Sequence, residues 1–389
     1  MSSSVKTSVD AVLEQAVASG AVPNVVAIAA DRDGIIYEGA VGPRVSGQQE
    51  DVSADTHYRI MSMTKIVATV AALQLVEQGK LDLDAPVEQY CPEFAKVQVL
   101  ERLDGDKPVL RAPASKATVK NLITHTSGLG YWFWNADITA WESATGTPNV
   151  LSGSKVVFTA PMVTDPGTKF VYGINTDWLG QVIEAAGAKK LDEAIKTGVT
   201  DPLGMNETVF AMSDEQRARS VPVHLQGPDG AWAPSEIDLK PAPDYWAGGH
   251  GLHSTPRDYL KFQRALLGNG TSPDGVTILE PETVQQAFSN QIGELDFPST
   301  IETADPASSH TLSLGPGYKW GYGLLLNTAD VPGRRRAWSG AWAGLLNTHF
   351  WVDRTTGITG AIYAQFLPFV TPEALKMYAD FETQLYASL

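Results

Sequence analysis

One apolar segment near the N-terminus constrains the fold of this chain more than any other feature. Between Met61 and Val76 most residues are apolar. A helix that is apolar all round is buried in a protein core, so we expect this segment to form a buried helix that ends at Gly79. Lys65 lies three residues after Ser62, and residues three apart share one face of a helix. The segment therefore predicts a buried lysine in contact with a serine.

The expected burial of Lys65 gives this pair its chemical interest. Desolvation penalises an ammonium group and lowers its pKa, and an amine that tends toward neutrality can activate a neighbouring serine as a nucleophile. The alternative is a structural pair, in which Ser62 caps the helix and the lysine extends to solvent. Two further Ser-x-x-Lys matches begin at Ser3 and Ser152, in a terminal segment and a glycine-containing loop. The motif alone does not decide between the two interpretations.

Composition excludes several classes of partner. The chain has 389 residues and a net charge of −15, with 29 basic against 44 acidic residues. This balance argues against a nucleic-acid partner, and we expect the one basic run, Arg334 to Arg336, to be the solvated tip of a turn. Cys91 is the single cysteine, which excludes an intrachain disulfide and fits a reducing compartment. The sequence contains neither an apolar run that would span a membrane nor a signal core at its start, so we expect a soluble, cytoplasmic protein without a membrane partner.

Predicted strands lie at both ends of the chain, and predicted helices lie between them. Two apolar runs separated by an Asp-Arg-Asp-Gly turn predict a hairpin near the N-terminus, and a meander is expected near the C-terminus. Between residues 86 and 205 no strand signal is strong. The predicted strands are residues 25–30, 35–41, 322–326, 336–340, 348–352 and 358–366.

This order of elements predicts an α+β fold with two domains. We expect residues 1–85 and 206–389 to form an α/β sandwich domain, in which helices flank an antiparallel sheet. Residues 86–205 are expected to form a mainly helical insertion domain. A cleft between two such domains is the usual place for a small-molecule site.

Three separated motifs point to one family. The first is Ser-Met-Thr-Lys at residues 62–65, the second begins at Tyr172 and reads Tyr-Gly-Ile-Asn, and the third is Trp-Ser-Gly-Ala at residues 338–341. Together they resemble the serine β-lactamase superfamily in its class C branch, most closely the family VIII carboxylesterases and the lovastatin-type acyltransferases. The resemblance runs from about residue 10 to the end of the chain and implies a β-lactamase/transpeptidase-like fold.

The resemblance also implies roles for individual residues. Ser62 would attack an acyl carbonyl and form an acyl-enzyme, with Lys65 and Tyr172 as general base and acid. Which of the two is the base in acylation stays open. Nearby cationic charge would favour the phenolate form of Tyr172. The backbone N–H groups of Ser62 and Ala341 would form the oxyanion hole, each contributing on the order of a hundredfold in rate.

Departures from the lactamase pattern indicate the substrate class. Ile174 stands where class C lactamases carry an asparagine, and Asn175 lies one residue beyond that position. Trp338, followed by Ser339 and Gly340, replaces the lysine of the lactamase Lys-Thr-Gly motif. The loss of an amide and a cation removes groups suited to the polar parts of a β-lactam. We therefore expect these five residues to line a pocket for an uncharged, apolar ester.

The aromatic run Tyr-Trp-Phe-Trp at residues 131–134 is a candidate for the wall of that pocket. Trp132 and Trp134 are predicted to line it, although aromatic residues also dominate ordinary cores. His125 and Ser127 are expected to have structural roles. His250 and His253 lack the spacing of a metal-binding helix, and no phosphate-binding or dinucleotide-binding loop is present. We therefore expect neither a metal nor an organic cofactor.

The sequence thus predicts a serine carboxylesterase that acts on small-molecule esters with short or medium acyl groups. Three alternatives remain: acyl transfer to an alcohol or amine, amide or weak β-lactam hydrolysis, and a non-catalytic binding protein on the same fold. Retention of the three reactive side chains favours an enzyme. An α/β-hydrolase is excluded, because the chain contains no Gly-x-Ser-x-Gly elbow. Neither the natural substrate nor the oligomeric state is predicted.

Overall fold

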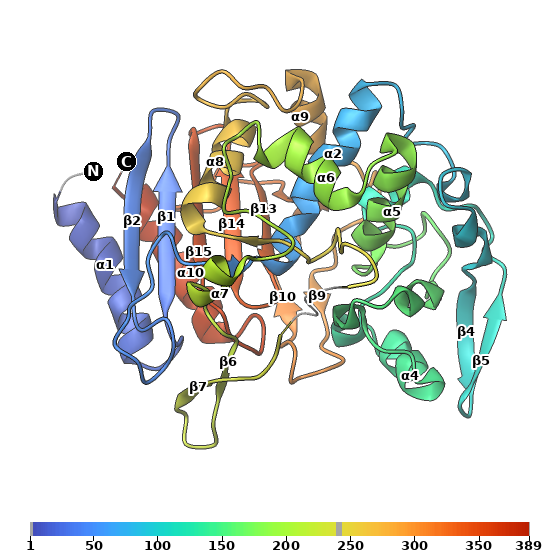
Figure 1. The fold of residues 1–389 in the computed structure, drawn as a ribbon, viewed down its shortest axis with the longest axis horizontal. Helices are drawn as coiled ribbons and strands as arrows, with labels where there is room; N and C mark the ends of the chain where they lie inside the picture. The colour runs from blue at the N-terminus through green and yellow to red at the C-terminus, as the bar shows by residue number, and fades with distance from the viewer. Residues whose placement is uncertain (1–2, 239–242, 389) are drawn as a thin grey trace.

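The computed structural model describes residues 3–238 and 243–388, in which an antiparallel sheet is covered by helices on both faces (Figure 1). Within this part of the chain, seven strands form the main sheet in the order β11-β12-β13-β14-β15-β1-β2. Strands from both ends of the sequence therefore share one sheet. Their bounds are β1 Val25–Ala30, β2 Ile35–Val41, β11 Tyr318–Trp320, β12 Leu325–Asn327, β13 Gly340–Gly344, β14 Thr348–Asp353 and β15 Ile358–Tyr363.

Helices cover both faces of this sheet, because its central strands are apolar on both sides. All residues of β1, β14 and β15 are buried. Successive side chains of a strand point to opposite faces. Alternate residues of β1 accordingly pack into two separate apolar clusters, one with α1 and α10 and the other with α2 and α8. These helices are α1 Ser3–Ala18, α2 Thr64–Glu77, α8 Pro256–Leu267 and α10 Pro372–Tyr386.

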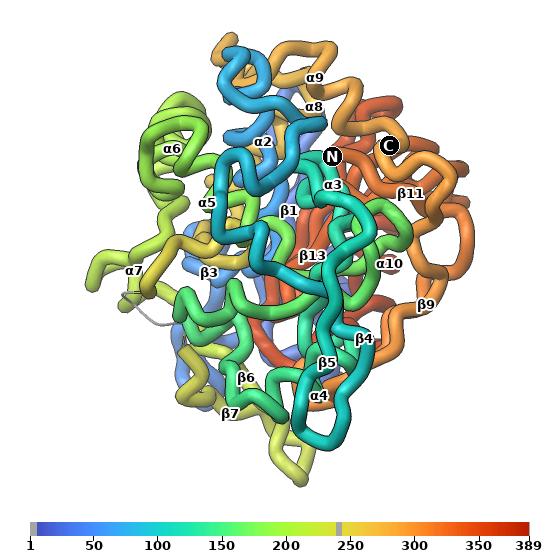
Figure 2. The backbone as a smooth tube through the Cα atoms, turned by 90° about the vertical axis from the view of Figure 1, so that its right-hand side faces the viewer, coloured from blue at the N-terminus to red at the C-terminus, as the bar shows by residue number. Residues whose placement is uncertain are grey.

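The remaining helices and short strands lie outside the main sheet. The hairpin β4–β5 and helix α4 lie at the opposite end of the molecule from α8 and α9 (Figure 2). The helices are α3 Val119–Ile123, α4 Ala136–Thr145, α5 Asn175–Gly187, α6 Leu191–Ile195, α7 Asp214–Ala218 and α9 Pro281–Ala287. The short strands pair as β3 Tyr58–Arg59 with β8 His253–Ser254, β4 Val99–Asp104 with β5 Lys107–Arg111, β6 His224–Gln226 with β7 Trp232–Pro234, and β9 Thr300–Ile301 with β10 Leu312–Ser313.

The predicted fold class is confirmed, with three corrections to the elements. The region predicted to lack strands contains the β4–β5 hairpin, whose partly exposed, charged residues hid its pattern. The predicted strand 322–326 begins only at Leu325, because Gly323 turns the chain with a positive φ. The predicted strand 336–340 is a turn, and β13 begins where that strand was expected to end. The division into domains 1–85 with 206–389 and 86–205 stays a prediction.

Helix α2 lies where its sequence requires, inside the molecule. Its residues from Thr64 to Leu73 are all buried, and α5 and α6 pack on it. A short 3-10 turn, Met61–Met63, precedes the helix. Met61 has φ +46°, a conformation that costs a non-glycine residue about 1 to 3 kcal/mol and is found mainly at functional sites. The turn thus holds Ser62 in a strained approach to the helix.

Candidate active site

Ser62, Lys65 and Tyr172 lie together at the start of α2. The Lys65 ammonium donates a hydrogen bond to Ser62 Oγ at 3.1 Å. Lys65 Nζ lies 4.8 Å from the centre of the Tyr172 ring, and Ser62 is close enough to the Tyr172 phenol to lower its pKa. All three residues are buried, and Lys65 is only 1% exposed. Tyr172 therefore joins Ser62 and Lys65, from which it is more than 100 residues away in the sequence, in one buried cluster.

Burial gives the lysine an unusual acidity. Desolvation lowers the pKa of Lys65 to about 7, and the negative charge of Asp177 partly opposes this shift. Asp177 lies on α5 and is itself fully buried. A lysine with such a pKa is neutral in a large fraction of molecules at neutral pH. The site therefore contains an amine that is free to accept a proton.

Two further acceptors fix the lysine in place. Lys65 Nζ donates to the Tyr131 hydroxyl at 3.0 Å and to the Gly249 carbonyl at 2.8 Å. With Ser62 Oγ, these acceptors satisfy all three hydrogens of an ammonium group. When Lys65 is neutral, Tyr131 and Gly249 can hold its two remaining hydrogens, which leaves the lone pair for the Ser62 hydroxyl. These hydrogen bonds thus orient the amine, and burial favours its neutral form.

Asp177 connects this network from the other side. The Tyr131 hydroxyl donates to Asp177 Oδ2 at 3.2 Å, and the Gly249 amide donates to Asp177 Oδ1 at 3.1 Å. His250 Nδ1 lies 3.6 Å from the same carboxylate. Asp177 was not predicted as a site residue, and Tyr131 was expected only as part of the aromatic run at the pocket wall. The available signal was an acidic residue next to Trp178 and Leu179 in the first turn of a helix, because a buried carboxylate requires a partner.

The acidity of Tyr172 differs from the sequence-based expectation. Burial raises the pKa of Tyr172 above its ordinary value, and hydrogen bonds with Ser62 and Trp342 only partly offset that rise. The phenol is therefore protonated at neutral pH, not the expected phenolate. His125 stacks on it with ring centres 4.6 Å apart, and burial lowers the pKa of His125 well below its usual range. A neutral imidazole brings no positive charge that would favour the phenolate form of Tyr172.

The tryptophan that contacts Tyr172 lies four residues after the one in the predicted third motif. Trp342 Nε1 donates to the Tyr172 hydroxyl at 2.8 Å, so Trp342 and not Trp338 meets the reactive cluster. Trp338 is 44% exposed and has φ +62° in the turn before β13. A strand advances about 3.3 Å per residue, which places the two indoles far apart along the chain. Ser339 donates to the Arg336 carbonyl and Gly340 packs against apolar side chains. These contacts do not support a place in the pocket for Trp338, Ser339 and Gly340, which stays a prediction.

The predicted oxyanion donor, Ala341, stays a prediction, although another residue of this strand lies beside the serine turn. Ala341 is paired with Leu325 of β12 on one side and with Trp351 of β14 on the other. Gly344 is the residue that reaches the serine turn, since a side chain there would come within 2.4 Å of the Ile60 carbonyl. Ala341 lies three residues earlier, about 10 Å along the strand. The same Trp-x-Gly pattern occurs at Trp338 and at Trp342, and only the second has the required position.

The other predicted pocket residues are all buried, and their polar groups have partners within the protein. Asn175 accepts a hydrogen bond from Ser127 and donates to the Leu129 carbonyl at 3.1 Å. Its amide thus supports a loop, and its contact with substrate stays a prediction. Ile174 is buried just before α5. Trp132 and Trp134 are buried, and their indoles donate to Asp305 and Ser309, respectively.

Of these two indoles, Trp134 is the one that borders the reactive cluster. Its ring centre is 5.5 Å from that of Tyr172, and it lines a cavity together with Trp342. Trp132 packs instead edge-on against Tyr131 and Phe133. Of the four aromatic side chains in this run, Trp134 is thus the one that lines the cavity.

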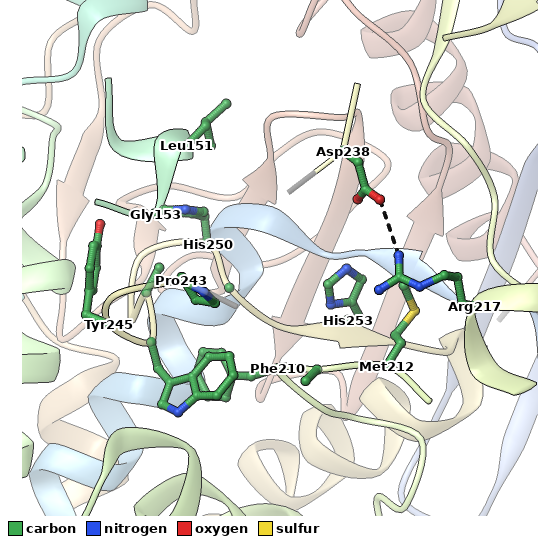
Figure 3. A pocket seen from close by; sticks show the side chains of 14 residues that line it. Leu151, Gly153, Phe210, Met212, Arg217, Asp238, Pro243, Tyr245, His250 and His253 are labelled. Carbon is green, nitrogen blue, oxygen red and sulfur yellow. Dashed lines mark hydrogen bonds and ion pairs between the residues drawn. The ribbon is translucent and has the colours of Figure 1, made fainter. Parts of the chain in front are cut away.

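A smaller cavity of about 50 Å³ lies on the far side of His250. Figure 3 shows His250 and His253 on its wall, with Arg217 paired to Asp238 at its rim. Desolvation lowers the pKa of His253 to about 3, so this imidazole is uncharged. Within residues 3–238 and 243–388, no three histidine, cysteine, aspartate or glutamate side chains are grouped to hold a metal ion. No helix in that part of the chain combines the length and apolarity that crossing a bilayer requires.

Comparisons with known proteins agree with this architecture. The family model described as Beta-lactamase matches residues 9–384. Lovastatin esterase from Penicillium rubens is 32% identical over 368 residues, which cover 90% of each protein. Monacolin J acid methylbutanoyltransferase from Aspergillus terreus is 28% identical over 96% of this chain and 94% of its own. The solved structure of simvastatin synthase from Aspergillus terreus has a TM-score of 0.85 at 26% identity and covers 100% of this chain and 99% of its own.

Proposed function

Since this chain belongs to the beta-lactamase family and is a serine hydrolase of that fold, we propose that it is a carboxylesterase for short- or medium-chain acyl esters. Ser62 is the nucleophile, and Lys65 in its neutral form is the base that accepts the Ser62 proton. The observation that carries the ester assignment is the indole of Trp342 on the Tyr172 hydroxyl. A neutral donor beside the reacting atoms suits an ester that carries no charge near its scissile bond better than a substrate that requires a cation there.

The acylation step follows from the two pKa values: that of Lys65 is lowered to about 7 and that of Tyr172 is raised above its ordinary value. Neutral Lys65 removes the proton as Ser62 Oγ attacks the acyl carbon, and the ester carbonyl becomes an oxyanion. The backbone N–H groups of Ser62 and Leu345 bind this oxyanion, since Leu345 follows the glycine that packs against the serine turn. Tyr172, which is protonated, gives its proton to the leaving alcohol and recovers one from the Lys65 ammonium. The products of this step are the alcohol and an acyl-Ser62 ester.

Water reverses these roles in deacylation. The Tyr172–Lys65 pair accepts a proton from water as its oxygen attacks the acyl carbon, and the Ser62 oxygen leaves and is reprotonated. An alcohol that occupies the place of water would receive the acyl group instead. This second outcome, acyl transfer, is favoured by the relatives named as acyltransferases. The two activities share one acyl-enzyme and differ only in the acceptor.

One side-by-side assay tests the proposal. Hydrolysis of p-nitrophenyl butyrate is compared with that of a chromogenic cephalosporin, and butyryl thioester is supplied with and without added alcohol. We expect the ester to be the faster substrate, with added alcohol diverting only part of the acyl group. A higher kcat/KM for the cephalosporin would overturn the substrate assignment, and complete diversion to the alcohol would identify a transferase.

The dependence of activity on pH reports the lysine. Because the pKa of Lys65 is lowered to about 7 and the neutral amine is the active form, kcat/KM should rise as pH increases through about 7 and then level off. Asp177 raises this pKa, so Asp177→Asn should move the rising limb to lower pH. The pKa values of the neighbouring His125 and His250 are lowered, which keeps their titration below this limb. A profile that is flat across the neutral range would contradict Lys65 as the base.

A matched pair of variants tests the placement of the third motif. Trp342→Phe removes the N–H that donates to Tyr172 and keeps an aromatic ring, and the loss of one such hydrogen bond is expected to lower kcat/KM about tenfold. Trp338→Phe makes the same chemical change in the exposed turn and should leave kcat/KM within about twofold. Both values are measured with p-nitrophenyl butyrate. A larger loss in the Trp338 variant would restore the original motif assignment.

A further inference from the structure

A cavity of about 310 Å³ lies next to the reactive cluster, at the end of the sheet. Strand β12 pairs with β13 only through Leu325–Ala341 and Leu326–Gly340, so the edge of β13 beyond Ala341 is open on that side. Trp134 and Trp342 form the wall toward Tyr172. The volume is that of a site for a small organic molecule.

Most of the wall is apolar, and several of its polar side chains are already occupied. Asn327 donates to two backbone carbonyls, and the Tyr378 hydroxyl accepts a hydrogen bond from Arg335. The larger apolar side chains come from β12, β13, the turn before α4, the segment around β10 and the segment after β15. They are Trp134, Leu312, Leu314, Leu325, Trp342 and Phe369.

One buried polar atom on this wall lacks a partner. His349 is 4% exposed, and its ring is stacked between those of Phe369 and Tyr378. Within the described residues, His349 Nε2 has no hydrogen-bond partner. Burial and the charge of Arg335 lower the pKa of His349 to about 3, so the imidazole is neutral. A buried polar atom without a partner is rare in native proteins, and a ligand in the cavity would supply one.

The basic run at residues 334–336 supplies a surplus positive charge. Arg335 is buried, contrary to the expected solvated tip, and its guanidinium binds Glu382 through two bonds of 2.7 and 2.6 Å. Glu382 is therefore already neutralised. Arg334 also lines the cavity, and its nearest acidic oxygen, on the same Glu382, is 3.8 Å away. Among residues 3–238 and 243–388, Arg334 thus has no acidic oxygen at hydrogen-bond distance, and it shares Glu382 with Arg335.

We propose that this cavity binds the part of the substrate remote from the scissile bond, and that this part is an apolar body carrying a single carboxylate that pairs with Arg334 and His349. The assignment rests on the proposed function, because it takes the ligand of the cavity to be the ester. One unbalanced arginine matches a monoanion, and an arginine binds a carboxylate through parallel hydrogen bonds. The neutral His349 adds one donor at the buried end.

The binding test uses the Ser62→Ala variant, so that it does not depend on turnover. Calorimetry compares monomethyl esters of adipic, suberic and dodecanedioic acid with the corresponding dimethyl esters, which differ only in the charged end. For at least one chain length, the monomethyl ester should bind about tenfold or more tightly than its dimethyl ester. Equal binding of both esters at every length would overturn the proposal.

Charge-matched variants locate the effect. Arg334→Gln should remove the preference for the monomethyl ester, and His349→Phe should reduce it. Arg336→Gln changes the same run outside the cavity, where Arg336 pairs with Asp330 at 3.0 Å, and should keep the preference. Equal losses in the Arg334 and Arg336 variants would contradict the site. Hydrolysis of p-nitrophenyl acetate by the wild-type protein tests the esterase proposal separately, because this substrate has no carboxylate.

Discussion

Ser62→Ala should lower kcat/KM for p-nitrophenyl butyrate by at least about ten-thousandfold, the range observed when the nucleophile of a serine hydrolase is removed. The substitution deletes the Oγ atom that forms the acyl-enzyme, and no other hydroxyl occupies its position beside Lys65 Nζ. The Tyr131 hydroxyl also contacts Lys65, but it donates to Asp177 and is held away from a substrate carbonyl. Only the background supplied by the oxyanion donors should remain.

Ser339→Ala is the matched control for this variant. Ser339 is buried, as Ser62 is, with 1% of its surface exposed against 9% for Ser62, and its hydroxyl donates to a backbone carbonyl. Its replacement should lower stability by about 1 kcal/mol and leave kcat/KM nearly unchanged. Retention of more than about a hundredth of the wild-type kcat/KM in Ser62→Ala would exceed what background catalysis supplies and would remove the nucleophile from the account.

Lys65→Met should lower kcat/KM by about a thousandfold or more, within the range of a lost general base. Methionine matches the length of the lysine stem but cannot accept the Ser62 proton. The variant should also lose the rising limb of the pH profile, because that limb reports the Lys65 amine. Lys155→Met, in the exposed loop that carries another Ser-x-x-Lys match, is the control and should behave as wild type.

A double variant separates the chemistry of Lys65 from its structural role. Lys65→Met leaves the Asp177 carboxylate buried without its cation, which is expected to cost about 3 to 5 kcal/mol of stability. Adding Asp177→Asn removes that buried charge and should recover much of the loss, as measured by urea unfolding. Activity should stay low in the double variant. Recovery of activity together with stability would assign Lys65 a structural role only.

The helix and its reactive pair could be predicted because their signals are local. An apolar run without a polar face requires burial, and the three-residue spacing places Lys65 on the face of Ser62. Tyr172 could be placed only by resemblance, and its acidity was misjudged because desolvation, which raises the pKa, exceeds the lowering effect of Ser62 and Trp342. The acidity depends on how completely the tertiary structure excludes water from the phenol, and a local sequence pattern does not report this.

The register of the third motif could not be predicted because two identical patterns compete. Trp338 and Trp342 each precede a small residue and a glycine. The positive φ of Trp338 and the end of β12 at Asn327 decide which one enters the sheet next to the serine turn. Both features depend on strand pairing between segments, and a local pattern contains neither. Asp177 and the Tyr131 hydroxyl were missed for a related reason. The packing of α2 against α5 brings Asp177 to Lys65, and the backbone pairing of Tyr131 with Tyr172 brings the second group there.

The most direct test is the mass of the intact protein during turnover. Wild-type protein is mixed with excess p-nitrophenyl butyrate, quenched in acid after a few turnovers and compared with Ser62→Ala and Ser339→Ala treated in the same way. We expect the mass of one butyryl group on the wild type and on Ser339→Ala, on the peptide that contains Ser62, and no addition to Ser62→Ala. A butyryl group on any other residue, or its presence in Ser62→Ala, would contradict the acyl-enzyme on which the account depends.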